Sequence, residues 1–276
     1  VLFRSGVQFR DLYGGGGART YLDVRGFGAT APQNTVVLVN GRRLNDIDNA
    51  GVEFANLPKD SVRRIEVLRG NSAAVLYGEG AVGGAVNIIA RPAAGANGTA
   101  VRGAVGGFGL REGALSTAHS SRDTTIAFGA NALDQEGWRQ NNELKQSGAD
   151  LELRRFSNRG EWFGTFATDK QHLGLPGARR VNLTTLQNLV ESDPRGAATP
   201  TDFTDQVGMR NVLGFSKALA GGGELAVDGG VRVKAQDSIV ISASGPAYDQ
   251  VVNTRLATYS FTPGCAGSRK AARCVA

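Results

Sequence analysis

Residues 224–234 read Glu-Leu-Ala-Val-Asp-Gly-Gly-Val-Arg-Val-Lys, and their character alternates along the chain. In an extended strand, Leu225, Val227, Val231 and Val233 point to one side, and the charged residues point to the other. Residues 125–132 repeat the pattern with apolar side chains at every second position. A period of two predicts strands that have one apolar face and one polar or small face.

Eight segments in the last two thirds of the chain share this alternation. They are residues 98–107, 110–120, 123–134, 145–156, 159–169, 207–219, 223–236 and 250–262. An apolar side opposed by a polar side is the pattern expected when lipid lies outside a barrel and water or polar protein lies inside it. The alternation therefore favours antiparallel transmembrane strands.

The lengths of the connections support the same interpretation. Those at 121–122, 157–158 and 220–223 are very short, whereas the intervening ones at 135–144, 170–206 and 237–249 are long. Outer-membrane barrels have short periplasmic turns and longer external loops. The first connection, at 107–109, fits weakly because it is short where a long loop is expected. A soluble all-β domain is the alternative that the alternation alone leaves open.

Composition excludes several other classes of protein. The chain has 276 residues, of which 41% are hydrophobic and 20% charged, so it can bury a core. The net charge is +6, and part of it comes from the basic tail. The basic residues form no long stripe, which disfavours nucleic acid as a partner. Cys265 and Cys274 lie near the end, and only two histidines occur, so we expect no disulfide framework and no metal site. No apolar run approaches the roughly 18 residues of a membrane helix, and no targeting peptide is visible.

Residues 1–92 predict a small α+β domain. Strands are expected at 21–25, 35–39, 64–68 and 85–90, and Asn40-Gly41 favours a tight hairpin turn. Helical turns are expected after Pro58 and at 72–77. Residues 93–98 then read as a linker.

The run Gly78-Glu-Gly-Ala-Val-Gly83 matches the dinucleotide fingerprint in its letters alone. That fingerprint requires a helix after the glycines and an acidic residue about 20 positions further on. Here a strand follows, and the next acidic residue after Glu79 is Glu112. We therefore interpret the run as a structural glycine segment.

An ordered series of motifs covers the first third of the chain. It comprises Arg25-Gly-Phe27, Val36-Val-Leu-Val-Asn-Gly-Arg-Arg-Leu44, Leu57-Pro58, Ser61-Val-Arg-Arg-Ile-Glu-Val-Leu-Arg-Gly70 and Ala74-Val-Leu-Tyr-Gly-Glu-Gly-Ala-Val-Gly-Gly-Ala-Val-Asn-Ile-Ile-Ala90. The series resembles the plug domain of TonB-dependent outer-membrane receptors. The strands that follow resemble the start of that family's barrel.

The resemblance implies a receptor and transporter of the bacterial outer membrane. A plug fills a barrel of about 22 strands and binds a scarce ligand, and TonB rearranges the plug. Family ligands are ferric siderophores, haem, cobalamin and carbohydrates. The resemblance implies no catalytic residues, no cofactor, no metal and no nucleic acid, so we expect a protein that is not an enzyme. Lipid, TonB and the ligand are the expected partners.

The resemblance also assigns roles to residues. Arg25 and Arg69 match arginines that lie between plug and barrel, where they pair with barrel glutamates. The glycines expected to serve turns and close backbone approach are Gly26, Gly41, Gly70, Gly78, Gly80, Gly83 and Gly84. Candidate ligand contacts in the outward plug loops are Arg10, Tyr13, Arg19, Gln33, Asn34, Asn45 and Asp46. The loop 170–206, with His172, Arg179 and Arg180, is a candidate to close over a ligand.

The chain departs from the family pattern in several ways. The TonB-contact segment and the family's first plug strand are not visible, and about eight strands are too few to enclose a plug. We expect a fragment: an N-terminally truncated plug at 1–92, a linker at 93–98, a partial barrel at 99–263 and an unrelated tail at 264–276.

Two other functions are weighed against this interpretation. A β-rich surface adhesin would explain the strands but not the motif series. A soluble nucleotide-binding enzyme would require helices on both sides of a parallel sheet. The receptor interpretation requires that the polar side of the late strands face the N-terminal third of the chain.

Overall fold

The computed structural model describes residues 6–11, 20–45, 51–52, 54, 57, 62–90, 97–179, 181–182, 187–219, 223–241 and 249–266. Four residues singled out by the sequence lie outside the described ranges: Tyr13, Arg19, Asp46 and Arg180. The turn expected after Pro58 lies outside them as well. Within the described ranges, the helices are all too short or too polar to cross a bilayer.

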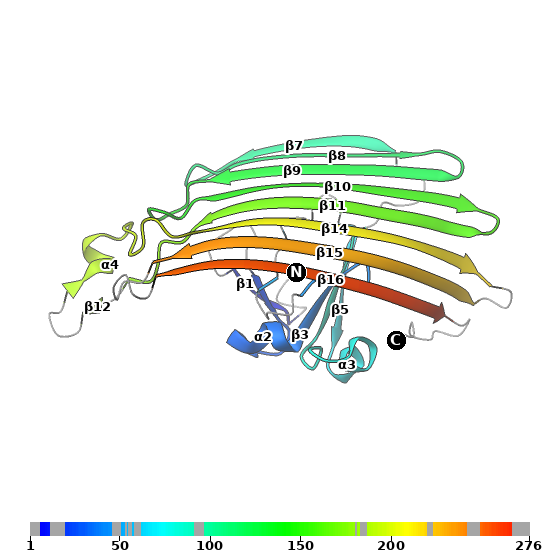
Figure 1. The fold of residues 1–276 in the computed structure, drawn as a ribbon, viewed down its shortest axis with the longest axis horizontal. Helices are drawn as coiled ribbons and strands as arrows, with labels where there is room; N and C mark the ends of the chain where they lie inside the picture. Colours follow the sequence, from blue (N-terminus) through cyan, green and yellow to red (C-terminus); the bar gives the residue numbers. More distant parts are fainter. Residues whose placement is uncertain are drawn as a thin grey trace.

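Eight long strands form one antiparallel sheet in which each strand pairs with its neighbour along the chain (Figure 1). They are β7 (Gly98–Val105), β8 (Arg111–Ser120), β9 (Thr124–Gln135), β10 (Leu144–Ser157), β11 (Gly160–Gly174), β14 (Phe203–Ala218), β15 (Glu224–Val240) and β16 (Gln250–Ala266). The eight predicted strands are confirmed. The sheet remains open, because β7 and β16 are not paired with each other.

The connections are sorted by length as predicted. The turns after β8, β10 and β14 are short, and the loops after β9, β11 and β15 are longer. We call these the short-turn end and the long-loop end of the sheet. The loop after β11 carries three small elements that the sequence did not predict: β12 (Val181–Asn182), β13 (Gln187–Asn188) and α4 (Leu189–Ser192).

Several strands are longer than their alternation indicated. β11 continues to Gly174, and β14 begins at Phe203. The strand expected to end at 262 continues to Ala266, which pairs with Glu224. Backbone pairing with a long neighbour extends these strands past the residues whose side chains alternate.

The N-terminal domain contains a four-stranded mixed sheet. Its order is β4 (Arg42–Arg43), β3 (Thr35–Val39), β6 (Gly84–Ile89) and β5 (Arg64–Arg69), and only β3 and β6 are parallel. A separate hairpin pairs β1 (Gln8–Asp11) with β2 (Thr20–Asp23). The helices are short: η1 (Gly28–Thr30), α2 (Ala31–Asn34) and α3 (Asn71–Tyr77).

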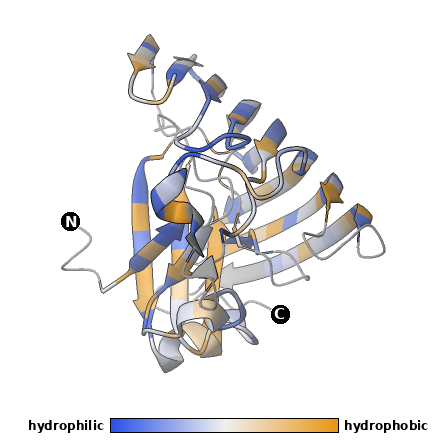
Figure 2. Ribbon diagram, turned by 90° about the vertical axis from the view of Figure 1, so that its left-hand side faces the viewer, coloured by the Kyte–Doolittle hydropathy of each residue, from blue (hydrophilic) through white to orange (hydrophobic). Residues whose placement is uncertain are grey.

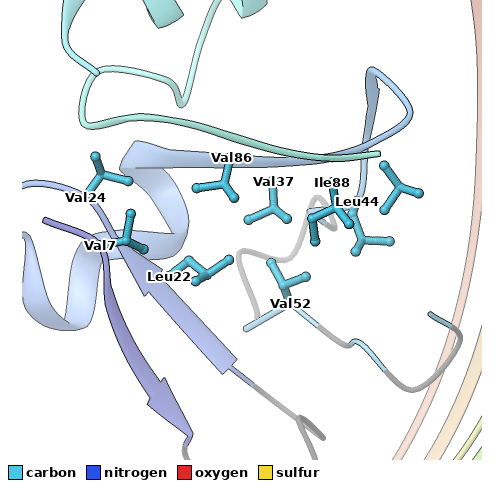
Figure 3. Packing of buried hydrophobic residues seen from close by; sticks show 9 residues of the cluster. Val7, Leu22, Val24, Val37, Leu44, Val52, Val86 and Ile88 are labelled. Carbon is cyan, nitrogen blue, oxygen red and sulfur yellow. The ribbon is translucent and has the colours of Figure 1, made fainter. Parts of the chain in front are cut away.

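A hydrophobic core holds this domain together (Figure 3). Val37 and Val86 come from the central strands, and Leu22, Leu44 and Val52 pack against them. All five side chains are nearly inaccessible to solvent. The domain therefore has a conventional core of its own.

The hairpin between β3 and β4 turns at Asn40 and Gly41, as predicted. Both residues have positive φ, 52° and 83°, which is the conformation of a tight hairpin turn. Asn87 fixes the turn, because its side-chain oxygen accepts a 2.9 Å hydrogen bond from the Gly41 amide. The glycine run at 78–83 lies between α3 and β6, so a strand follows it, as the sequence indicated.

The large sheet has the opposite distribution of side chains. On β14, Thr204 and Gln206 are buried, whereas Val207, Met209 and Leu213 are exposed. Figure 2 shows hydrophilic and hydrophobic residues alternating along the strands. The sheet thus has a polar face, which is covered, and an apolar face, which is not.

Candidate functional site: the contact between the N-terminal domain and the sheet

The β3–β4 hairpin reaches the polar face of the large sheet. Arg42 of β4 forms an ion pair with Asp228 of β15, and both side chains are mostly buried. Arg232, four residues along β15, donates a 2.7 Å hydrogen bond from Nη1 to the carbonyl oxygen of Leu44. The polar side of the sheet therefore faces the N-terminal domain, which confirms the orientation that the sequence required.

A cavity of about 20 Å³ remains beneath the hairpin. It is lined by Val39, Asn40, Arg42, Glu152, Phe163, Thr165, Arg210 and Val212. A space of this size and polarity fits one water molecule. The contact is thus polar on both sides, which distinguishes it from the core of the N-terminal domain.

Glu152, which lines this cavity from the sheet, belongs to a group of paired charges. Arg154 of β10 lies between two acidic side chains, pairing with Glu161 of β11 and, at 3.7 Å, with Glu152. Glu152 is only 6% exposed. A buried charge is tolerated when it is paired in this way, whereas removal of one partner leaves the other uncompensated.

Toward the long-loop end, the same face carries a row of amide side chains. Gln146, Gln171, Gln206 and Gln236 follow one another across β10, β11, β14 and β15 in a single register row. Gln146 donates a 2.9 Å hydrogen bond from Nε2 to Oε1 of Gln171, and both are buried. Across these four strands, amides therefore take the place that ion pairs have nearer the plug hairpin.

Asp23 organises the turn that carries the Arg25-Gly-Phe27 motif. Its carboxylate accepts hydrogen bonds from the amides of Arg25, Gly26 and Phe27 at 3.1, 2.8 and 3.0 Å, and from Gly28 at 2.7 Å. Burial alone would raise the pKa of Asp23, but these four amides outweigh it and lower the pKa below its ordinary value. The turn is fixed by a carboxylate that sequence analysis did not single out.

The two arginines that the sequence assigned to the wall contact, Arg25 and Arg69, are exposed on the N-terminal domain. The Arg25 guanidinium lies near Gly70, and that of Arg69 lies near Gly6. Their pairing with barrel glutamates stays a prediction. An arginine that does reach the described wall is Arg42, which the sequence does not distinguish from its neighbour Arg43.

The described ligand-contact candidates do not form a single cluster of contacts. Arg10 is exposed on β1, and Gln33 is exposed on α2. Asn34 donates from Nδ2 to the Thr30 carbonyl at 2.9 Å. Asn45 accepts from the Val37 amide at 2.7 Å and donates to the Thr35 carbonyl at 3.1 Å, so it supports the strand β3.

Close backbone approach requires two of the predicted glycines. A Cβ at Gly83 would lie 2.8 Å from the Asn34 carbonyl oxygen and 2.9 Å from the Phe27 ring. A Cβ at Gly84, where φ is +147°, would lie 2.6 Å from the Leu68 carbonyl oxygen. Larger residues at these positions would displace strands of the small sheet.

A small α+β domain is thus seated through charged groups on the polar face of an antiparallel sheet whose other face is apolar, which is the arrangement expected of a plug against the wall of an outer-membrane barrel. Residues 3–85 match the family model described as TonB-dependent Receptor Plug Domain. The N-terminal domain therefore matches the plug domain of TonB-dependent receptors over these residues, and we call it the plug from here on. The large sheet has the fold of the receptor barrel, in an open, eight-stranded form.

Curated relatives resemble the plug region. The vitamin B12 transporter BtuB of Photobacterium profundum is 39% identical over 84 residues, which are 30% of this chain and 13% of that protein. The ferric enterobactin receptor of Pseudomonas aeruginosa is 38% identical over 87 residues, or 28% of this chain and 11% of that protein. The chain thus matches only a small part of the length of these relatives.

Solved structures resemble nearly the whole chain in fold. The pyoverdine outer membrane receptor FpvA of Pseudomonas aeruginosa, bound to pyoverdine, has a TM-score of 0.68 and 14% identity, and the match covers 96% of this chain and 39% of that one. The unliganded ferric citrate transporter FecA has a TM-score of 0.67 and 15% identity, covering 94% and 39%. At this identity the similarity establishes the fold.

Proposed function

We propose that the chain belongs to a receptor that carries a scarce ligand across the bacterial outer membrane with energy supplied through TonB. In this proposal residues 1–92 form the plug, 93–98 a linker and 99–263 part of the barrel wall. No covalent chemistry is required of the protein. Its partners are outer-membrane lipid, TonB and the ligand.

The observation that carries the proposal is the seat of the plug hairpin on the wall. Arg42, Asp228, Arg232 and the small polar cavity join plug and wall through polar contacts. Polar contacts that separate are replaced by hydrogen bonds to water at little net cost in free energy, whereas separating an apolar core exposes apolar surface to water. A plug with its own core and a polar seat is suited to move within the barrel without unfolding.

The ligand class follows from the named relatives. Their printed names are a vitamin B12 transporter and ferric enterobactin receptors. We therefore propose a ferric siderophore or cobalamin as the ligand, and we place haem and carbohydrate after them. Balanced charges on the inner wall near the plug do not favour one of these ligands over another.

Uptake measurements test this function. The receptor that contains this chain is produced in the outer membrane of a host that lacks its own siderophore and cobalamin receptors, with and without TonB. We expect accumulation of iron-55 ferric enterobactin or cobalt-57 cobalamin only when TonB is present. Accumulation that is independent of TonB would contradict energised transport, and uptake of neither probe would remove both ligand assignments.

A matched pair of variants separates transport from expression. Asp228→Ala removes the ion pair at the seat. Asp237 lies on the same strand as Asp228, and Asp237→Ala removes its exposed ion pair with Arg255 of β16. We expect only the Asp228 variant to change uptake or to admit large antibiotics. Equal behaviour of the two variants would show that the seat has no part in transport.

A further inference from the structure

Two loops at the long-loop end are joined by the side chain of Arg139. Arg139 belongs to the loop 136–143, and its guanidinium reaches the loop 175–202. Nη1 donates to the Gly177 carbonyl at 2.7 Å, and Nη2 donates to the carbonyls of Pro176 and Gly196 at 3.2 and 3.0 Å. Nε also donates to Gly196, at 3.2 Å. One side chain therefore bonds to two separate segments of the second loop.

Asn141 makes a second connection between the same loops. It has a positive φ of 54°, which asparagine tolerates better than most residues. Its side-chain amide lies within hydrogen-bonding distance of the carbonyls of Thr199 at 2.7 Å, Asp202 at 2.8 Å and Leu175 at 3.3 Å. The Gln140 amide, between the two connections, donates to the Arg195 carbonyl at 2.7 Å.

The acceptors in this contact are backbone carbonyls. Among the described residues, no carboxylate forms an ion pair with Arg139, and its guanidinium donates to backbone carbonyls instead. The Pro176 carbonyl also accepts from the Ala198 and Thr199 amides, so the carbonyls that depend on Arg139 are those of Gly177 and Gly196. Loss of the guanidinium removes the donor to these two carbonyls, which costs more than the bond itself contributes. The backbone also fits closely here, because a Cβ at Gly137 would lie 2.2 Å from the Asn142 carbonyl oxygen.

The joined loops present an aromatic side chain with a cation against it. The Arg195 guanidinium lies 5.5 Å from the centre of the Trp138 ring, and its Nε donates to the Trp138 carbonyl at 2.9 Å. Phe108, from the turn between β7 and β8, meets the same ring edge-on at 5.5 Å. Trp138 remains 49% exposed. Three connections thus meet around one accessible aromatic residue.

We propose that Arg139 and Asn141 are positioning residues that lock the loop 136–143 to the segments 175–179 and 195–202 of the next loop as a rigid rim, and that this rim contributes to ligand affinity without moving. This inference differs from the expectation that the second loop closes over a ligand, because both ends of that loop are tied to its neighbour. The part concerning affinity rests on the proposed function. The part concerning the lock does not.

Protease cleavage tests the lock without a ligand. Glu191 lies on α4 within the second loop and is exposed, so glutamyl endopeptidase added to the membrane-embedded protein cleaves there when the loop opens. We expect Arg139→Ala to accelerate this cleavage on the order of tenfold, and Arg139→Lys to accelerate it less. Asn141→Asp, which removes the donors and keeps a residue tolerant of positive φ, is expected to act in the same direction.

The control is Arg155→Ala, which removes an exposed arginine near the short-turn end of β10. We expect its cleavage rate to match that of the unaltered protein. Heat-modifiable gel mobility of every variant shows that the barrel has formed. Unchanged cleavage in both folded Arg139→Ala and folded Asn141→Asp would overturn the lock.

Uptake kinetics test the role in affinity. With iron-55 ferric enterobactin as the probe, a rigid rim predicts a half-saturation concentration raised severalfold in Arg139→Ala, with an unchanged maximal rate. A fall in maximal rate alone would indicate a moving lid and overturn the proposal. Absence of uptake in the unaltered protein would instead count against the proposed function and would leave the cleavage result standing.

Discussion

The plug buries apolar side chains, whereas the large sheet exposes them. Val37 and Leu44 of the plug are each 1% exposed, while Leu213 of β14 is 61% exposed and Phe261 of β16 is 70% exposed. Conversely, the polar side chain of Gln171 on the sheet is only 2% exposed. The charged β3–β4 hairpin of the plug lies at the boundary between the two regions. The distribution of side chains in each region therefore suits a different environment.

The contrast shows that burial is set by what lies on each side of an element. An apolar face without a protein partner is stable where lipid covers it, and a polar face is stable where water or polar protein covers it. The plug has a hydrophobic core because its apolar side chains have to be shielded from water. The described part of the sheet has only a small apolar cluster around Leu144 and Leu173, so we expect its stability to depend mainly on pairing between strands and on the lipid of the proposed function.

The strongest test of this comparison truncates the same residue type in both regions. Leu44→Ala in the plug core is expected to lower the free energy of unfolding by about 2–5 kcal/mol, because it leaves a cavity among packed side chains. Leu213→Ala on the outer face is expected to change it little, because lipid fills the space. Both losses of stability are measured by recording amide hydrogen exchange in β3 and β14 at increasing urea concentrations. Equal losses would mean that the outer face is packed like a core.

A charge on the outer face sharpens the comparison. Leu213→Arg is expected to destabilise the protein in a bilayer by about 2–4 kcal/mol if the residue lies near the bilayer midplane. Leu219→Arg, in the short turn after β14, is expected to cost about 0–1 kcal/mol, the value for a position near the interface. Urea titration in lipid vesicles measures the difference. A tolerated arginine at 213 would show that water, not lipid, covers this face.

The boundary between the regions is tested by a double-mutant cycle. Arg42→Ala and Asp228→Ala each leave one mostly buried charge without its partner, at a cost of about 1–3 kcal/mol. If the ion pair acts as a unit, the double variant loses less than the sum of the single losses. Hydrogen exchange of the β3–β4 hairpin supplies the free energies. Strict additivity would show that the two side chains act independently.

Local features were predictable from the sequence. The strand Thr35–Val39 and the turn at Asn40 and Gly41 follow from residue types that act within a few positions. The eight long strands follow from alternation, because lipid and polar protein impose opposite requirements on successive residues. Strand ends such as Gly174 and Phe203 were not predictable, because pairing between neighbours determines them.

Contacts between distant parts of the chain were not predictable. Arg42 pairs with a residue 186 positions further on, and nothing near Arg42 distinguishes it from Arg43. Arg139 binds backbone carbonyls, which carry no sequence signal. Asp23 had a local signal that passed unused: a carboxylate shortly before two glycines can accept amides from the following turn. The roles expected for Arg25 and Arg69 stay predictions.

The smallest expected effect concerns the pH dependence of the plug. The pKa of Asp23 is lower in the folded plug than in the unfolded chain, so its carboxylate stabilises the plug above the unfolded pKa of about 3.9. This contribution is lost as the pH falls through the folded pKa. Asp23→Asn is therefore expected to weaken the plug near neutral pH and to flatten its pH dependence below about pH 4.

Hydrogen exchange in β2 and β6, measured across that pH range, checks this expectation. Glu66→Gln is the matched control, because Glu66 is also a plug carboxylate but bonds to the side chains of Arg64 and Asn87 instead of to a row of amides. If both variants flatten the profile equally, the turn at Arg25–Gly28 owes no special stability to Asp23. If only Asp23→Asn does so, the plug carries within its own fold a charge that stabilises it independently of the wall, as its separate core already indicates.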